Sequence, residues 1–70
     1  MRRFSLQILL NGEPFTTDAR DLASLCAALG FADARIATAV NGNFVAAPSR
    51  AATALAEADE IEIVAPRQGG

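Results

Sequence analysis

Apolar and polar positions alternate near the start of the chain. Apolar side chains occupy every second position from Phe4 to Leu10, which is typical of a strand that buries one face. Asn11-Gly12 follows and favours a type I′ hairpin turn, because both residues tolerate a positive φ. Residues 13–17 are therefore predicted to return as an antiparallel strand. Pro14 cannot donate a ladder hydrogen bond, so we expect this strand at an edge of the sheet.

The spacing then changes to that of an amphipathic helix. Its apolar stripe has i, i+3, i+4 and i+7 spacing and consists of Leu22, Leu25, Cys26 and Leu29. Asp18 is predicted to cap this helix, with Asp21 in the first turn, where a carboxylate is favourable. Gly30 is predicted to end the helix in the left-handed conformation, with Phe31 folding back onto the last turn.

The second half of the chain predicts three shorter strands. Residues 36–40 form the third strand, Asn41-Gly42 is a second turn of the same type, and residues 43–45 return. Ser49 is predicted to cap a short helical or 3₁₀ turn through Ala54, and Leu55 is its apolar anchor. The last strand alternates acidic and aliphatic residues, with Ile61 and Ile63 on one side and Glu60, Glu62 and Val64 on the other.

This order of elements predicts an α+β fold. Two hairpins, one helix between them and a last strand close most compactly as a mixed sheet of about five strands. The helix lies across one face, and the first and last strands are central and parallel. This is the β-grasp, or ubiquitin-like, arrangement. We expect residues 1–70 to form a single β-grasp domain, with residues 66–70 as a flexible C-terminal tail.

The amino-acid composition excludes several classes of function. The chain has no His and one Cys, which excludes the usual zinc sites, catalytic triads and disulfide frameworks. A net charge of −2 argues against a nucleic-acid partner. No segment has the length of a membrane span or the apolar run of a signal peptide, so we expect a cytoplasmic protein that contacts no membrane. With so few catalytic groups, we expect a protein that is acted upon rather than an enzyme, with no bound cofactor or metal.

The C-terminal residues carry the candidate chemistry. A terminal Gly69-Gly70 places an unhindered carboxylate on an arm that can thread through a narrow channel in a partner. Gly70 is therefore the candidate reactive residue, and Arg67, Gln68 and Gly69 are the candidate threading residues. The alternative interpretation is an ordinary frayed terminus or an engineered scar.

Three segments resemble the ThiS/MoaD family of ubiquitin-like sulfur carriers, and they resemble its ThiS branch most. They are Val40-Asn41-Gly42-Asn43-Phe44-Val45, Asp59-Glu60-Ile61-Glu62-Ile63-Val64 with Pro66, and Gly69-Gly70. The resemblance implies that an E1-like, ThiF-like enzyme uses ATP to adenylate the Gly70 carboxylate. A persulfide donor then supplies sulfur, and the resulting thiocarboxylate serves a ThiG-like thiazole synthase in thiamine biosynthesis.

Two alternatives use the same C-terminus. A MoaD-like small subunit of molybdopterin synthase carries sulfur in the same form. A ubiquitin-like modifier would instead join Gly70 to lysines of target proteins. All six basic residues of the chain are Arg, so it offers no lysine for chains of such a modifier.

Partner contacts are expected on the strand face next to this C-terminus. Glu60 and Glu62 are candidates within an acidic group that also includes Glu57 and Asp59, and Phe44 is a further candidate. Acidic side chains on such a face steer association, although an ordinary solvated face is an equal alternative. Cys26 lies on the apolar helix stripe, which favours a buried packing residue over a reactive thiol.

Overall fold

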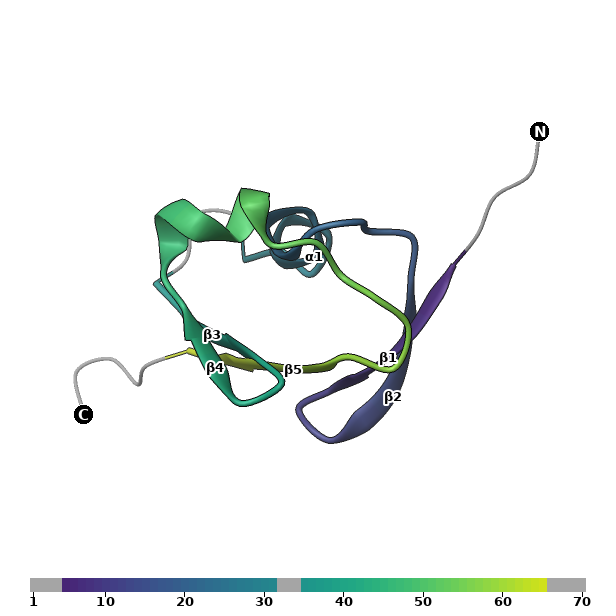
Figure 1. Ribbon diagram of the computed structural model, residues 1–70. Coiled ribbons are helices and arrows are strands. Elements are labelled where there is room, and N and C mark those ends of the chain that lie inside the picture. Colours follow the sequence, from purple (N-terminus) through teal and green to yellow (C-terminus); the bar gives the residue numbers. More distant parts are fainter. Residues whose placement is uncertain (1–4, 32–34, 66–70) are drawn as a thin grey trace.

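The computed structural model of the chain describes residues 5–31 and 35–65. The described elements form a five-stranded sheet in the order β2-β1-β5-β3-β4, with α1 and a 3₁₀ helix, η1, on one side of it (Figure 1). Strands β1 and β5 are parallel and both lie inside the sheet, as the sequence predicts. The elements are β1 Leu6–Leu10, β2 Glu13–Thr17, α1 Leu22–Ala28, β3 Ala37–Val40, β4 Asn43–Val45, η1 Ala47–Ala52 and β5 Glu60–Val64.

Both predicted hairpins are present. Asn11 and Asn41 each have φ 51°, and Gly12 and Gly42 each have φ 85°, which are the positive values that a type I′ turn requires. Strand β2 is an edge strand, and Pro14 lies in it opposite Leu9. The first predicted position of β1, Phe4, lies outside the described residues.

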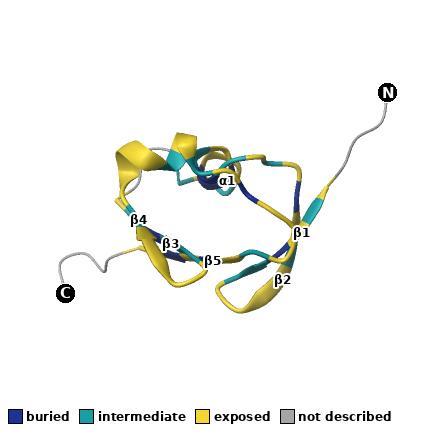
Figure 2. Cartoon of the chain, viewed as in Figure 1, coloured by how far each residue is buried: buried dark blue, intermediate teal, exposed yellow. Residues whose placement is uncertain are grey.

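The core lies between α1 and the inner face of the sheet. Figure 2 shows that buried positions occur both in α1 and in the strands of the sheet below it. The predicted helix stripe is confirmed, because Leu22 and Leu25 are completely enclosed and Cys26 is buried. Leu55 is the buried anchor of the connection before β5, also as predicted. The remaining core residues are Ile8, Ile61 and Ile63.

The start of α1 differs from the prediction. Asp21, not Asp18, is the N-cap, and its carboxylate accepts a hydrogen bond of 2.8 Å from the Ser24 N–H. Asp21 is held extended by a bridge to Ala54, so the helix can begin only after it. The carboxylate of Asp18 instead accepts a hydrogen bond from the Ser5 hydroxyl.

The end of α1 matches the prediction. Gly30 has φ 88°, and its N–H donates to the Ala27 carbonyl. The Phe31 N–H donates to the Cys26 carbonyl, which completes a Schellman motif, and the Phe31 side chain packs against the core. The C-terminus of the helix is therefore fixed by local signals in the sequence.

The 3₁₀ helix η1 begins two residues before the predicted cap. Ala46 is its N-cap and makes no side-chain cap bond, whereas Ser49 lies inside the helix. Pro48 explains the earlier start, because proline suits the first turn of a helix, where its missing N–H leaves no bond unmade.

Arg50 fastens η1 to β3. Its Nε donates to Thr38 Oγ1 at 3.0 Å, and its Nη2 donates to the Ile36 carbonyl at 2.7 Å. Thr38 is 1 % exposed, and its hydroxyl in turn donates to the Val45 carbonyl. The buried hydroxyl therefore both donates and accepts a hydrogen bond, as expected of a buried polar group.

The side chains of both turn asparagines bond to β5. The Asn-Gly pairs predict only the two turns, so these contacts with β5 are an additional feature of the structure. The Oδ1 atom of Asn11 accepts from the Ile63 N–H at 2.9 Å, and that of Asn41 accepts from the Glu60 N–H at 2.9 Å. A left-handed residue turns its carbonyl away from the neighbouring strand, so the side-chain oxygen takes its place.

Within the described part of the chain, the helices are too short or too polar to cross a membrane.

Candidate functional site

The exposed face of β5 and its neighbours is the candidate site. Strand β5 is central in the sheet and alternates strictly, with Ile61 and Ile63 buried and Glu60, Glu62 and Val64 exposed. The predicted alternation is therefore confirmed. Because the sheet carries α1 and η1 on its inner side, the outer side of β5 is open to a partner (Figure 2).

The strand register brings Phe44 and Glu62 onto the same face. Ala39 pairs with Phe44 on β4 and with Glu62 on β5, and directly paired residues share a face of the sheet. Phe44 is 72 % exposed, and Val64, which pairs with Ala37, is 60 % exposed. The two alanines fill little space between the larger side chains. The structure thus places two exposed apolar side chains and two carboxylates on one surface.

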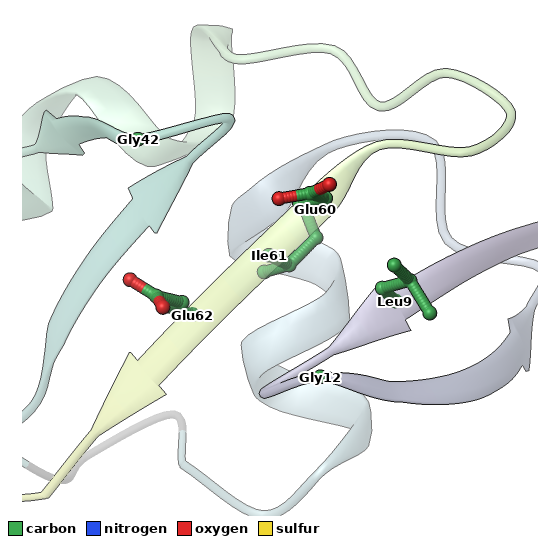
Figure 3. Close-up of a pocket in the computed structure, with 6 residues that line it drawn as sticks. All are labelled: Leu9, Gly12, Gly42, Glu60, Ile61 and Glu62. Atoms are coloured by element: carbon green, nitrogen blue, oxygen red, sulfur yellow. The ribbon is translucent and has the colours of Figure 1, made fainter.

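A hollow of about 230 Å³ lies beside these carboxylates, between the two hairpin turns. Figure 3 shows Glu60 and Glu62 on β5, with the turn of Gly12 on one side and the turn of Gly42 on the other. Neither glycine would meet another heavy atom within 4 Å if it carried a Cβ, so the turns leave open space there. The full lining consists of Leu9, Gly12, Gly42, Glu60, Ile61 and Glu62.

The predicted acidic group divides into two pairs. Glu57 accepts a hydrogen bond from the Gln7 N–H, and Asp59 accepts from the Ala56 N–H and from Asn41 Nδ2. These two carboxylates stabilise the loop that leads into β5. Glu60 and Glu62 lie instead on the exposed face, where a basic surface can reach them.

The candidate reactive residues lie beyond the described part of the chain. Strand β5 ends at Val64, and Ala65 is the next described residue. The predicted site residues Arg67, Gln68, Gly69 and Gly70, and the predicted tail 66–70, lie outside the described residues. The structure therefore describes the exposed face of β5, whereas the roles of the tail residues remain predictions.

Cys26 is separate from this face. It is 4 % exposed on the core side of α1, which confirms the prediction of a packing residue. Burial raises the pKa of its thiol, and the charge of Arg50 partly opposes this rise. A buried thiol with a raised pKa is a poor nucleophile at neutral pH.

In residues 5–31 and 35–65, no group of three or more His, Cys, Asp or Glu side chains is arranged to hold a metal ion.

Sequence reasoning missed two features of the face. It placed Val64 on the same side of the last strand as Glu60 and Glu62 but did not name it as a partner contact, although an aliphatic residue in line with two glutamates is a detectable signal. It also missed the hollow, because this depends on two turns that are distant in sequence and lie on either side of β5. Only the strand order brings those turns together.

A mixed sheet in this order, with one helix across one face and an open opposite face, defines a ubiquitin-like β-grasp protein. The ThiS family model matches residues 8–70, so the chain belongs to the ThiS family. This membership supports a role as a sulfur carrier in thiamine biosynthesis.

A solved structure agrees with this assignment. The crystal structure of a thiamine biosynthesis protein (ThiS) from Geobacter metallireducens superimposes with a TM-score of 0.78 and 26 % sequence identity. The similarity covers 93 % of this chain and 100 % of that one. The β-grasp prediction is thereby confirmed. No curated protein matches the chain significantly.

Proposed function

We propose that this chain carries sulfur as a thiocarboxylate on Gly70 and delivers it to thiazole synthase in thiamine biosynthesis. The observation that carries the proposal is the family match, which continues through residue 70 and so includes both glycines. The chain is a co-substrate that enzymes act on. ATP is consumed by the activating enzyme and is not bound by the carrier.

The first step follows from the chemistry of a carboxylate. An α-carboxyl group has a pKa of about 3.3–3.7, so at neutral pH it is an anion and a poor electrophile. Adenylation by an E1-like, ThiF-like enzyme converts one oxygen into a leaving group, with release of pyrophosphate. The terminal sulfur of a persulfide then attacks the acyl carbon, and AMP leaves. The product is an acyl disulfide that keeps the S–S bond of the persulfide. A second thiol attacks the inner sulfur of this bond, forms a disulfide with it, and the thiocarboxylate leaves.

The residues before Gly70 would deliver its carboxylate to the enzyme. Gly69 lacks a Cβ and so fits a narrow channel, while Gln68 and Arg67 offer polar contacts along it. From Pro66 to Gly70 an extended chain reaches roughly 16 Å. That length lets the reacting group enter an active site while the folded domain stays at the entrance.

The exposed face of β5 would provide the docking surface for the activating enzyme and for a ThiG-like synthase. Phe44 and Val64 supply apolar contact, and the carboxylates of Glu60 and Glu62 favour a partner with basic groups at the matching positions. Charges of this kind mainly accelerate association. Rapid association with moderate affinity suits a carrier, since it must leave one enzyme to reach the next.

Chain-dependent exchange between ATP and pyrophosphate tests the activation step. The purified activating enzyme should catalyse exchange when the full chain is added, and deletion of Gly70 should abolish it. A circular dichroism spectrum shows whether the shortened chain keeps the fold. Intact mass of the chain isolated from its host shows whether Gly70 carries the free carboxylate. Exchange that survives the deletion would contradict the proposal.

Complementation separates the thiazole pathway from the molybdopterin pathway. The chain should restore growth of a thiazole auxotroph that lacks its own carrier, and it should not restore molybdoenzyme activity. The opposite pattern would favour the MoaD-like alternative. A modifier would instead leave covalent conjugates that survive reducing, denaturing electrophoresis.

A further inference from the structure

The two edges of β5 are held differently near its C-terminal end. On one edge, β3 pairs with β5 as far as Val64. On the other edge, the pairing with β1 covers only Glu60 and Ile61, because β1 turns away at Asn11. Beyond Ile61, the described bonds on this edge come from the side chain of Asn11.

That side chain continues the parallel ladder. The Leu9 and Asn11 N–H groups donate to the carbonyls of Asp59 and Ile61. In an uninterrupted parallel ladder, the next bonds would join Ile63 to the carbonyl of residue 11 and the N–H of residue 13. The Asn11 amide supplies both of them: Oδ1 accepts from the Ile63 N–H at 2.9 Å, and Nδ2 donates to the Ile63 carbonyl at 3.2 Å.

Asn41 forms a matched contact at the other end of β5. It has the same φ of 51°, precedes a glycine with the same φ, and also makes two side-chain hydrogen bonds. These bonds reach the Glu60 N–H and the Asp59 carboxylate, at the start of the strand. In both contacts an asparagine Oδ1 accepts from a backbone N–H of β5, and Asn11 is the one at the C-terminal end of the strand.

We propose that Asn11 is a positioning residue for the chemistry at Gly70. Together with the pairing of Val64 to Ala37 on the other edge, the contact of Asn11 with Ile63 fixes the end of β5, from which the chain continues to the reacting carboxylate. Loss of this contact leaves the end of β5 held by β3 alone, so the strand end is less firmly fixed and the effective concentration of the carboxylate at the partner's active site falls. This inference rests on the proposed function.

Hydrogen exchange tests the structural part without any enzyme. In Asn11→Gly, which tolerates the positive φ, the Ile63 amide should exchange roughly tenfold faster. In Asn11→Asp the acceptor remains and the donor is lost, so exchange should be intermediate. In Asn41→Gly the Glu60 amide should accelerate instead, and the Ile63 amide should stay close to the wild-type rate.

Steady-state ATP–pyrophosphate exchange tests the functional part on the same full-length chains. Asn11→Gly should lower kcat by about two- to fivefold and leave KM almost unchanged, because the docking face is intact. Asn11→Asp should lie between Asn11→Gly and the wild type. Asn41→Gly, which loses the same number of hydrogen bonds, should keep a kcat close to the wild-type value.

The outcomes are distinguishable. An equal loss of kcat in Asn11→Gly and Asn41→Gly would reduce the role of Asn11 to general stability and overturn the inference. An unchanged Ile63 exchange rate in Asn11→Gly would also overturn it. If the wild-type chain supports no ATP–pyrophosphate exchange, the proposed function fails and the positioning role fails with it. If the wild-type chain supports exchange and the Asn11→Gly variant has the same kcat, the positioning role alone is rejected.

Discussion

The two faces of β5 have opposite environments although they belong to the same five residues. Ile61 and Ile63 are 1 % and 6 % exposed against α1, whereas Glu60, Glu62 and Val64 face outward. The inner face holds the fold together, and the outer face is available to partners. Because side chains alternate along a strand, substitutions can change one face with little effect on the other. The following predictions test how completely the two are separated.

The largest effect is expected at Ile61. Removal of its side chain in Ile61→Ala should lower the free energy of unfolding by about 3–4 kcal/mol, since it leaves a cavity under α1. Urea denaturation followed by circular dichroism measures this, because the chain has no Trp or Tyr for fluorescence. Glu62→Ala is the matched control on the outer face and should change stability by no more than about 0.5 kcal/mol. Similar losses in both variants would contradict the separation.

The next effect concerns Arg50, which supports the inner face from η1. Arg50→Ala should cost about 1–3 kcal/mol, because the Ile36 carbonyl and Thr38 Oγ1 lose charged donors. Arg50→Lys should recover only part of this, since an ammonium group does not reproduce the planar donor pair. The same denaturation experiment applies. Full recovery by lysine would show that charge alone matters at this position.

The sequence predicted those features of the fold that depend on residues close together in the chain. Alternation identified the inner face, Asn-Gly identified both turns, and Gly30 identified the end of α1, because each of these signals is local. The N-cap was misplaced because Asp21 is held extended by a bridge to Ala54, a residue that is distant in the sequence. Ser49 was misassigned because Pro48 starts the turn earlier.

The candidate site was predicted less completely than the core. Glu60, Glu62 and Phe44 were identified, but the sequence did not reveal that Ala39 places Phe44 and Glu62 in one row. The hydrogen bonds from Asn11 and Asn41 to β5 depend on strand order, which single residues do not encode. The match of the ThiS family model through Gly70 reaches residues that the structure does not describe.

A smaller effect is expected from the ionisation of Cys26. Burial raises its pKa above the ordinary 9.0, so above this pH the unfolded chain loses its proton first. The free energy of unfolding should therefore fall as the pH rises above 9. The chain has no Tyr and no Lys, so no other side chain is expected to titrate in this range. The Cys26→Ala variant should show a flatter dependence, and an equally steep one would contradict this assignment.

The smallest effect on stability is expected from Glu62→Lys. The free energy of unfolding should change by no more than about 0.5 kcal/mol, because the side chain is exposed. Association with the activating enzyme should slow by about three- to tenfold at low salt, and the difference should shrink at high salt. Stopped-flow association kinetics measure both. The control is Glu13→Lys, which makes the same charge change on edge strand β2 and should leave the association rate close to the wild-type value.

Mass spectrometry of the C-terminal peptide tests most directly the central claim that Gly70 carries sulfur. The chain is incubated with ATP, a persulfide donor and the activating enzyme, and is then cleaved after Glu62. The peptide from Ile63 to Gly70 contains neither Met1 nor Cys26, so oxidation of those residues cannot imitate the mass of an added sulfur. Replacement of one oxygen of Gly70 by sulfur is the predicted result. An unmodified peptide, obtained with an enzyme that is active on another carrier, would contradict it.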